Sequence, residues 1–216
     1  MRGSTSLTFE VARSSERHRS IRRFQRLGYS ALGREDLIPP GTNGPPKLKS
    51  LNDRLQLIEA RLGSETVGVI RWGVYSSVAG TDLYADSVFR QRAGLPSRDP
   101  SLYSRTDRLL IHPRYRRGMV LIGLARKCLE LAVRAGIQYD LCWSEKSLSR
   151  LYCRLGYRRL PQQLVGPLGA PLLPQICRVS HFRERWAGSD HIDRTRSVFS
   201  PRPVSYTHLT LPTSSV

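Results

Sequence analysis

The stretch LLIHPRYRRGMVLIGLARKCLELAVRAG, residues 109–136, decides the fold. An apolar run at its start ends at His112-Pro113, and a short basic turn follows before apolar residues recur at helical spacing. The first N–H groups of a helix have no partner inside it, and together with the helix dipole they form a site for an anion. The pattern therefore predicts a strand, an anion-binding turn and a helix over 119–135 that ends at Gly136.

Arginine dominates the charge of the chain. The 216 residues carry 35 Lys and Arg against 17 Asp and Glu, a formal net charge of +18, and only four of the basic residues are lysines. A field this positive attracts nucleic acids, anionic membranes or acidic proteins, whereas arginine-rich codon usage would explain it without any partner. The arginines are spread over every predicted element instead of lying with aromatics on one face, so a nucleic-acid-binding module ranks below an enzyme.

Length and hydropathy predict one globular domain. The chain is long enough for a full core, and no apolar run approaches the roughly 20 residues of a membrane helix. The first residues lack the apolar core of a secretion signal, so we expect a cytoplasmic protein without a membrane span. The four cysteines form no C-x-x-C pair and no histidine lies at finger spacing, so we expect reduced thiols and no metal site.

The end of the chain has a different origin from the rest. VSYTHLTLPT, residues 204–213, resembles the translation of a sequencing-library adapter, and a match over ten residues is poorly explained by chance. We therefore expect a single domain over 1–203 and an adapter-derived tail over 204–216, which is excluded from the fold.

Hydrophobic periodicity places the other elements around the opening stretch. Strands are expected over 6–11, 54–62, 67–75, 105–111 and 139–143 with a closing pair over 157–165 and 172–179, and helices over about 15–27, within 82–93 and over 147–155. The hairpin in the first half favours antiparallel strands, and the strand–helix alternation in the second half favours parallel ones. The order predicts an α/β fold with a mixed sheet and helices on both faces.

This order and the opening motif resemble the GCN5-related N-acyltransferase (GNAT) superfamily over about 7–179. LLIHPRYRRG resembles the strand and acyl-carrier turn of that superfamily, and the A-x-x-x-G over 132–136 resembles the end of its long helix. LYCRLGYRR, residues 151–159, resembles its Y-x-x-L-G-aromatic signature. The resemblance implies a mainly antiparallel sheet of about seven strands with a splayed parallel pair.

Within the superfamily, the chain most resembles the branch of long-chain N-acyl amino acid synthases and acyl-homoserine-lactone autoinducer synthases. Residues 50–72 resemble that branch's acidic residue, strand, turn and V-G-x-x-R, which places Arg71 on the family arginine. DRLL, residues 107–110, places Arg108 on the strand arginine, and GAPLLPQICRVSHF resembles the final strand.

Some positions depart from the family pattern. Met119 and Leu121 stand where the superfamily has close-approach glycines, with Gly118 one position early, and such glycines let backbone amides close on a pyrophosphate. Acyl carrier protein has the same pantetheine arm with one phosphate, so these departures favour it over coenzyme A as the donor. Arg105 stands where the autoinducer branch has a glutamate, which removes a general base from that site.

Acyl transfer from a thioester to an amine needs a neutral amine, a donor for the oxyanion and a proton for the thiolate. The backbone N–H of Ile111 or His112 would supply the donor, and the resemblance implies that Tyr152 supplies the proton, unless it is an ordinary surface tyrosine. His112 itself is either a base or a structural residue before proline.

Arginines inside strands are rarely buried unpaired. Arg71 and Arg108 either bind the acceptor's carboxylate through the guanidinium fork or form an internal ion pair with Asp53 or Asp107. Asp53 is also a candidate for orienting the acceptor ammonium. The predicted catalytic set is Tyr152, Arg108, Arg71 and Asp53, and the predicted donor-binding set is Leu110, Ile111, His112, Arg116, Arg117, Gly118, Met119 and Val120, with the two arginines of the turn either binding phosphate or simply solvated.

We therefore predict an N-acyltransferase that moves a long-chain acyl group from acyl carrier protein to the amine of an amino acid or similar small molecule. The donor, acyl carrier protein with its phosphopantetheine or acyl-CoA, is a co-substrate, and neither a tightly bound cofactor nor a metal is expected. The alternatives are an acetyl-CoA-dependent N-acetyltransferase and the basic nucleic-acid-binding module.

Overall fold

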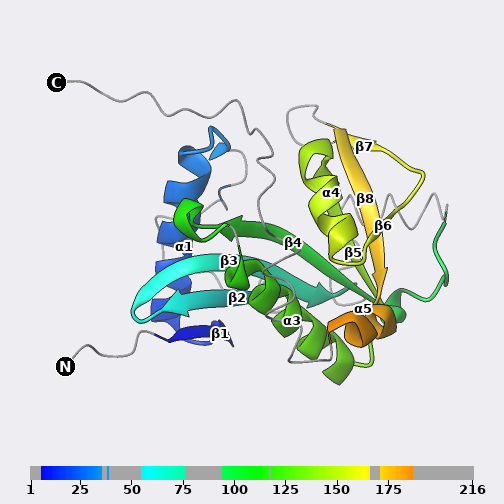
Figure 1. Cartoon of the computed structure of the whole chain (residues 1–216), viewed down its shortest axis with the longest axis horizontal. Coiled ribbons are helices and arrows are strands. Elements are labelled where there is room, and N and C mark those ends of the chain that lie inside the picture. The colour runs from blue at the N-terminus through cyan, green and yellow to red at the C-terminus, as the bar shows by residue number, and fades with distance from the viewer. Residues whose placement is uncertain are drawn as a thin grey trace.

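A computed structural model describes residues 6–35, 38, 55–75, 94–116, 118–165 and 171–186 (Figure 1). Four sequence-based expectations lie outside these residues: the helix within 82–93, Asp53, Arg117 and the adapter-like tail. The described residues hold the strands and helices around which the candidate site is built.

The sheet contains eight described strands: β1 (Leu7–Val11), β2 (Leu55–Leu62), β3 (Glu65–Val74), β4 (Tyr103–Ile111), β5 (Tyr139–Glu145), β6 (Arg158–Arg159), β7 (Leu164–Val165) and β8 (Pro171–Arg178). Their order is β1-β2-β3-β4-β5-β8-β6, and β7 also pairs with β8. Among the described strands, only β4 and β5 pair in parallel. The predicted mixed, mainly antiparallel sheet is confirmed.

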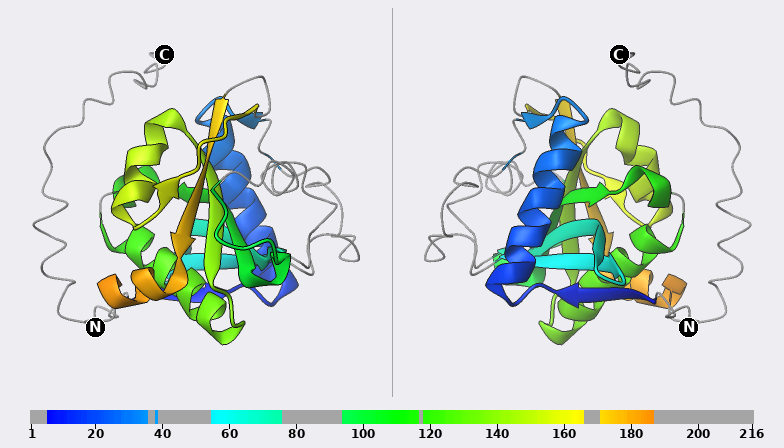
Figure 2. Two further views of the ribbon diagram at one scale, coloured as in Figure 1. Left: turned by 90° about the vertical axis from the view of Figure 1, so that its right-hand side faces the viewer. Right: turned by 90° about the vertical axis from the view of Figure 1, so that its left-hand side faces the viewer.

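Helices cover both faces of this sheet (Figure 2). They are α1 (Ser15–Ser30), α3 (Met119–Arg134), α4 (Lys146–Arg154) and α5 (Val179–Trp186), with short 3-10 turns at Pro100–Leu102 and Pro113–Tyr115. The apolar side of α1 packs with Val69 and Leu110 on one face, whereas α3 packs with Ile70 and Trp72 on the other. The alternation of side chains along β3 thus supplies both cores.

The first helix is longer than its sequence indicated. It begins after Ser14, whose hydroxyl accepts a hydrogen bond from the N–H of Arg17 at 3.2 Å, and it continues through Gly28 to Ser30. Gly28 does not end the helix, because its role is close packing: a Cβ there would lie 2.6 Å from the Leu110 side chain. In the sequence, a glycine that is needed for close packing cannot be distinguished from one that ends a helix.

The parallel pair of strands is splayed, as the resemblance implied. β4 and β5 pair only from Tyr103 to Arg105 and from Tyr139 to Leu141, although both strands continue well beyond these residues. The register of β3 against β4 shifts between Val69 and Arg71, and Arg108 on β4 has a φ of 51°. Such a bulge bends and twists its strand, so β4 turns away from β5 at this point.

The C-terminal part differs from the expectation in two ways. The closing pair is not continuous, since the segment before β8 forms only two short strands around Pro161, which cannot donate to a ladder. After β8 the chain forms α5, which the sequence reading missed, and Phe182 on this helix is buried in the main core. In the described part of the chain, no helix has the length and apolarity needed to cross a membrane.

Removal of residues 204–216 is expected to leave stability unchanged. The described core is built from residues up to α5, which ends at Trp186, so the residues that form it all remain when the tail is removed. A chain that ends at Pro203 should melt within about 2 °C of the full chain in a thermal scan. A much larger loss would show that the adapter-like residues belong to the folded protein.

Candidate active site

The end of β4 presents one backbone N–H to the splay. The N–H of His112 donates to the carbonyl of Val67 at 2.9 Å, and Ile111 pairs with Gly68. Successive N–H groups point to opposite edges of a strand, so the N–H of Ile111 faces away from β3, toward β5. Of the two predicted oxyanion donors, the Ile111 N–H is therefore the one directed into the splay.

Side chains of the basic turn hold this strand end in place. The Nε of Arg116 donates to the Ile111 carbonyl at 3.3 Å. The Nδ1 of His112 accepts from the N–H of Arg114 at 3.3 Å, and its ring lies 5.6 Å from that of Tyr115. These contacts give His112 a capping role in the turn.

The turn leads directly into the exposed N-terminus of α3. Gly118 is the N-cap with a φ of 133°, a conformation that favours glycine, and no side chain caps the helix. The first N–H groups of α3 therefore have no side-chain cap, an arrangement that suits an anion, as the helix dipole also does. Met119 is 42% exposed at this entrance, whereas Val120 is buried beneath it and Leu110 packs on the opposite face against α1.

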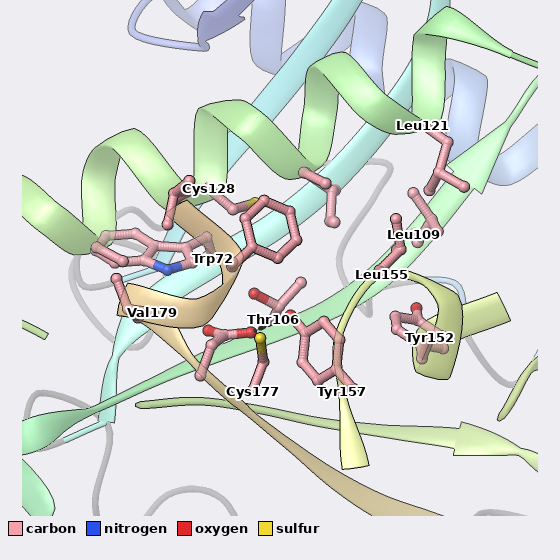
Figure 3. Close-up of a pocket in the computed structure, with 16 residues that line it drawn as sticks. Trp72, Thr106, Leu109, Leu121, Cys128, Tyr152, Leu155, Tyr157, Cys177 and Val179 are labelled. Carbon is pink, nitrogen blue, oxygen red and sulfur yellow. Dashed lines mark hydrogen bonds between the residues drawn. The ribbon is translucent and has the colours of Figure 1, made fainter. Parts of the chain in front are cut away.

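Tyr152 lies in the interior, so it is not the surface tyrosine that the sequence left open. It projects from α4, is only 6% exposed, and lies edge-to-face with Tyr157 at 5.6 Å (Figure 3). Among the described residues, none forms a hydrogen bond with its hydroxyl. Burial raises the pKa of Tyr152 well above its usual value, so this hydroxyl stays protonated at neutral pH.

Tyr152 lines a cavity between the sheet and helices α3, α4 and α5. The cavity volume is about 40 Å³. Most of its walls are apolar and include Leu109, Leu121, Ala125, Leu129, Leu155 and Phe182. The thiols of Cys128 and Cys177 also face it, and all four cysteines of the chain are free.

A buried carboxylate, which the sequence reading missed, lies at the floor of this cavity. Asp140 on β5 accepts hydrogen bonds from the Ser104 hydroxyl and, at 2.5 Å, from the Tyr157 hydroxyl. Burial raises its pKa, and the two hydrogen bonds act in the opposite direction. An aspartate in the middle of the apolar YDLCW run was the available signal.

The opposite face of the sheet carries a cluster of arginines around one carboxylate. Asp107 accepts two hydrogen bonds from Arg71, at 2.6 and 2.5 Å, and a further one from Arg105. Burial by itself would raise the pKa of Asp107, but the charges of Arg71 and Arg105 outweigh it and hold the pKa at about 2. The internal ion pair considered for Arg71 is therefore present in the structure.

Arg108 completes this cluster without a carboxylate of its own. It is half-buried, and none of the ion pairs among the described residues involves it. Burial and the neighbouring charge of Arg71 lower its pKa. Among the described residues, three arginines thus face a single aspartate, which gives this part of the described structure a surplus of positive charge.

Two aromatic residues not singled out from the sequence border the arginine cluster. The Tyr29 hydroxyl is buried without a hydrogen-bond partner in the described chain, and burial raises its pKa to about 12. The Trp143 ring lies under the Arg105 guanidinium, 4.8 Å from its centre. Neither position carries a local pattern that marks it as part of a site, because both come from elements distant in sequence.

The comparisons with known proteins show the fold. No protein-family model and no curated protein matches the chain. Among solved structures, FeeM, an N-acyl amino acid synthase from uncultured soil microbes, is 15% identical with a TM-score of 0.60 and covers 83% of this chain and 94% of its own. MesI, a CoA-dependent acyl-homoserine lactone synthase, is 16% identical with a TM-score of 0.56 over 85% and 96%.

A third match belongs to the same fold. The aminoglycoside acetyltransferase AAC(6')-Ib, solved with coenzyme A and kanamycin, is 16% identical with a TM-score of 0.56 and covers 85% of this chain and 100% of its own. The chain therefore has the GNAT fold that the sequence resemblance predicted.

Proposed function

We propose that this protein is an N-acyltransferase that moves an acyl group from a pantetheine thioester to the amine of a small acceptor with a carboxylate. The observation that carries the proposal is the splay between β4 and β5. An apolar cavity lined by Tyr152 lies on one face of the sheet, and an arginine cluster with surplus positive charge lies on the other. An acyl donor suits the apolar cavity, and an anionic acceptor suits the arginine cluster. The fold shared with FeeM is consistent with both.

The reaction uses few protein groups. The neutral amine attacks the thioester carbon, and the new C–N bond forms as the carbonyl oxygen becomes an oxyanion that accepts from the Ile111 N–H. The C–S bond then breaks, and the Tyr152 hydroxyl gives its proton to the departing thiolate. The amine nitrogen loses one proton to water, and a proton from solvent restores the Tyr152 hydroxyl. Asp53 is our proposal for the group that orients the amine.

The acceptor carboxylate is assigned to Arg108. Arg71 and Arg105 are both committed to Asp107, so Arg108 is the member of the cluster whose fork can bind a second carboxylate. The buried hydroxyl of Tyr29 is the neighbouring group that could donate to the same anion. We propose these two residues, with Arg71 as the supporting ion pair, as the acceptor site.

Acyl carrier protein is our proposed donor. Gly118 leaves the N-terminus of α3 without a side-chain cap, which suits one phosphate, while Met119 stands exposed where a pyrophosphate would approach. The proposed donor-binding residues are the end of β4 and this turn, with Arg116 and Arg117 nearest the phosphate. The net charge of +18 would also speed encounter with an acidic carrier.

Initial rates with limiting acyl carrier protein should fall about tenfold or more between about 50 mM and about 300 mM NaCl, because salt screens the attraction between the two proteins. The matched measurement uses the same acyl group on coenzyme A, whose rate should be lower at low salt. Equal or better turnover with acyl-CoA that does not respond to salt would overturn the choice of donor and leave acyl transfer standing. The products can be identified by mass spectrometry of lipid extracts from a host that expresses residues 1–203.

A further inference from the structure

Two polar side chains in the apolar cavity have no hydrogen bond of normal geometry with any described residue. Trp72 on β3 and Thr106 on β4 lie directly opposite each other, and both line the cavity (Figure 3). Each residue is 3% exposed. The indole N–H of Trp72 forms no hydrogen bond with a described residue, and the Thr106 hydroxyl forms none of normal geometry, although Asp140 and Cys128 lie near it.

Such groups are costly to bury unless something in the cavity satisfies them. Together with Asp140 on β5, they bring a donor, a hydroxyl and an acceptor from three adjacent strands to one side of the same cavity. Each carboxylate oxygen of Asp140 already accepts one hydrogen bond and has a second lone pair. The remaining walls are largely apolar, so the cavity resembles a hydrocarbon-binding site with one polar cluster, formed by Trp72, Thr106 and Asp140.

We propose that this polar cluster selects acyl chains that carry a hydroxyl group near the end remote from the thioester. The inference rests on the proposed function, because the cavity is then the place of the acyl chain. A hydroxyl can accept from the Trp72 N–H and donate to Thr106 or Asp140, which matches the three groups better than a keto oxygen that only accepts. A plain chain would leave the Trp72 N–H and the Thr106 hydroxyl without a hydrogen-bond partner.

The distance along β4 sets where this hydroxyl lies on the chain. Thr106 and Ile111 are five positions apart, and at about 3.3 Å per residue the strand spans roughly 16 Å between them. An extended hydrocarbon with C–C bonds of about 1.5 Å in staggered rotamers advances about 1.3 Å per carbon. The hydroxyl therefore belongs on the order of ten carbons from the thioester carbonyl.

The cavity must open for such a chain. Its volume of about 40 Å³ is room for about three waters. A chain that reaches Thr106 therefore displaces the water that such a space can hold. It also moves Leu109 and Leu121, the leucines that line the path from Ile111 to Thr106. This displacement is favourable only when the incoming group replaces the hydrogen bonds of the water.

Binding can be tested without any turnover. Isothermal titration of the full chain with dodecanoic acid, its 10-hydroxy derivative and its 3-hydroxy derivative compares the three ligands directly. We expect the 10-hydroxy acid to bind about tenfold more tightly than the other two. Equal affinities in the unmodified protein would overturn the proposal and indicate that ordered water alone satisfies Trp72 and Thr106.

Variants locate the preference in the cavity. Thr106→Val and Trp72→Phe keep the approximate shape and remove one polar group each, so each should abolish most of the tenfold preference while the affinity for dodecanoic acid stays within about threefold. Leu129→Val lines the same cavity, removes no polar atom and should change all affinities alike. If both polar variants still bind the 10-hydroxy acid more tightly, the hydroxyl binds elsewhere and the proposal is wrong.

Turnover separates this inference from the proposed function. If dodecanoyl and 10-hydroxydodecanoyl thioesters both react at equal kcat/KM, acyl transfer stands and the hydroxyl selection fails. If neither reacts but the 10-hydroxy acid binds preferentially, the cavity site stands and the proposed function fails.

Discussion

Replacement of Tyr152 by phenylalanine is expected to lower kcat by about 10² to 10⁴, while the KM values for donor and acceptor stay nearly constant. The change removes one hydroxyl from a buried ring and leaves the edge-to-face contact with Tyr157 intact. Without that proton the thiolate must leave as an anion in an apolar cavity, which is costly in the transition state but not in the ground state.

The pH dependence gives a second readout of the same group. Because burial raises the pKa of Tyr152 well above its usual value, the hydroxyl remains a proton donor through neutral and mildly alkaline pH. The rate should therefore not fall until the pH passes above the ordinary tyrosine pKa of about 10. A decline near neutral pH that disappears in Tyr152→Phe would contradict this assignment.

Tyr157→Phe is the matched control, since it removes a hydroxyl from the neighbouring ring. That hydroxyl donates to Asp140 at 2.5 Å, so its loss should reduce the free energy of unfolding by about 1–3 kcal/mol. The kcat of this variant should stay within about threefold of the unmodified enzyme. Equal losses of kcat in both variants would show that the two rings act only through the shape of the cavity.

Arg108→Met is expected to raise the acceptor KM by about 10-fold to 100-fold, the loss of a charged hydrogen bond to a carboxylate. The KM for the donor should not change, because the arginine cluster lies on the opposite face from the cavity. An amine without a carboxylate should react equally slowly with both proteins, since the contact is already missing.

Arg71→Met removes a charge from the same cluster but should act on stability. Arg71 holds the buried Asp107 with two hydrogen bonds, so its loss leaves that carboxylate partly unpaired and should cost about 3 kcal/mol of unfolding free energy. The low pKa of Asp107, about 2, means that its pairing stabilises the fold above the unfolded pKa of about 4 and is lost as pH falls toward 2. Arg71→Met should weaken this acid dependence more than Arg108→Met does, because the charge of Arg108 contributes less to the low pKa of Asp107.

An Arg108→Met protein that unfolds, or one that folds with an unchanged acceptor KM, would remove Arg108 from the proposed acceptor site. The first result would make it a structural partner of Asp107 and Tyr29, and the second would make it a solvated residue of the bulge. Urea denaturation of the two variants beside the unmodified chain distinguishes these outcomes from the predicted one.

The sequence by itself determined the order of the elements and the place of the strand–turn–helix unit at residues 109–136. Periods of two and of three to four residues are local signals, and so are the proline and glycine at the two ends of the turn. These signals were enough to predict the mixed sheet, and the family resemblance added the splay between β4 and β5, which the structure confirms. The resemblance also marked Arg71, Arg108 and Tyr152 as candidates.

Only the tertiary structure decided what surrounds those candidates. The bulge at Arg108 and the pairing with Val67 determine which N–H enters the splay, and both depend on the register between strands. Ion pairing of Arg71 with Asp107, and the approach of Tyr29, join residues from separate elements. The polar cluster of the cavity likewise combines side chains from three strands that are adjacent in the sheet but distant in the chain. Local periodicity carries no information about such register and proximity, because a single-residue shift of a strand would reverse every side chain on it.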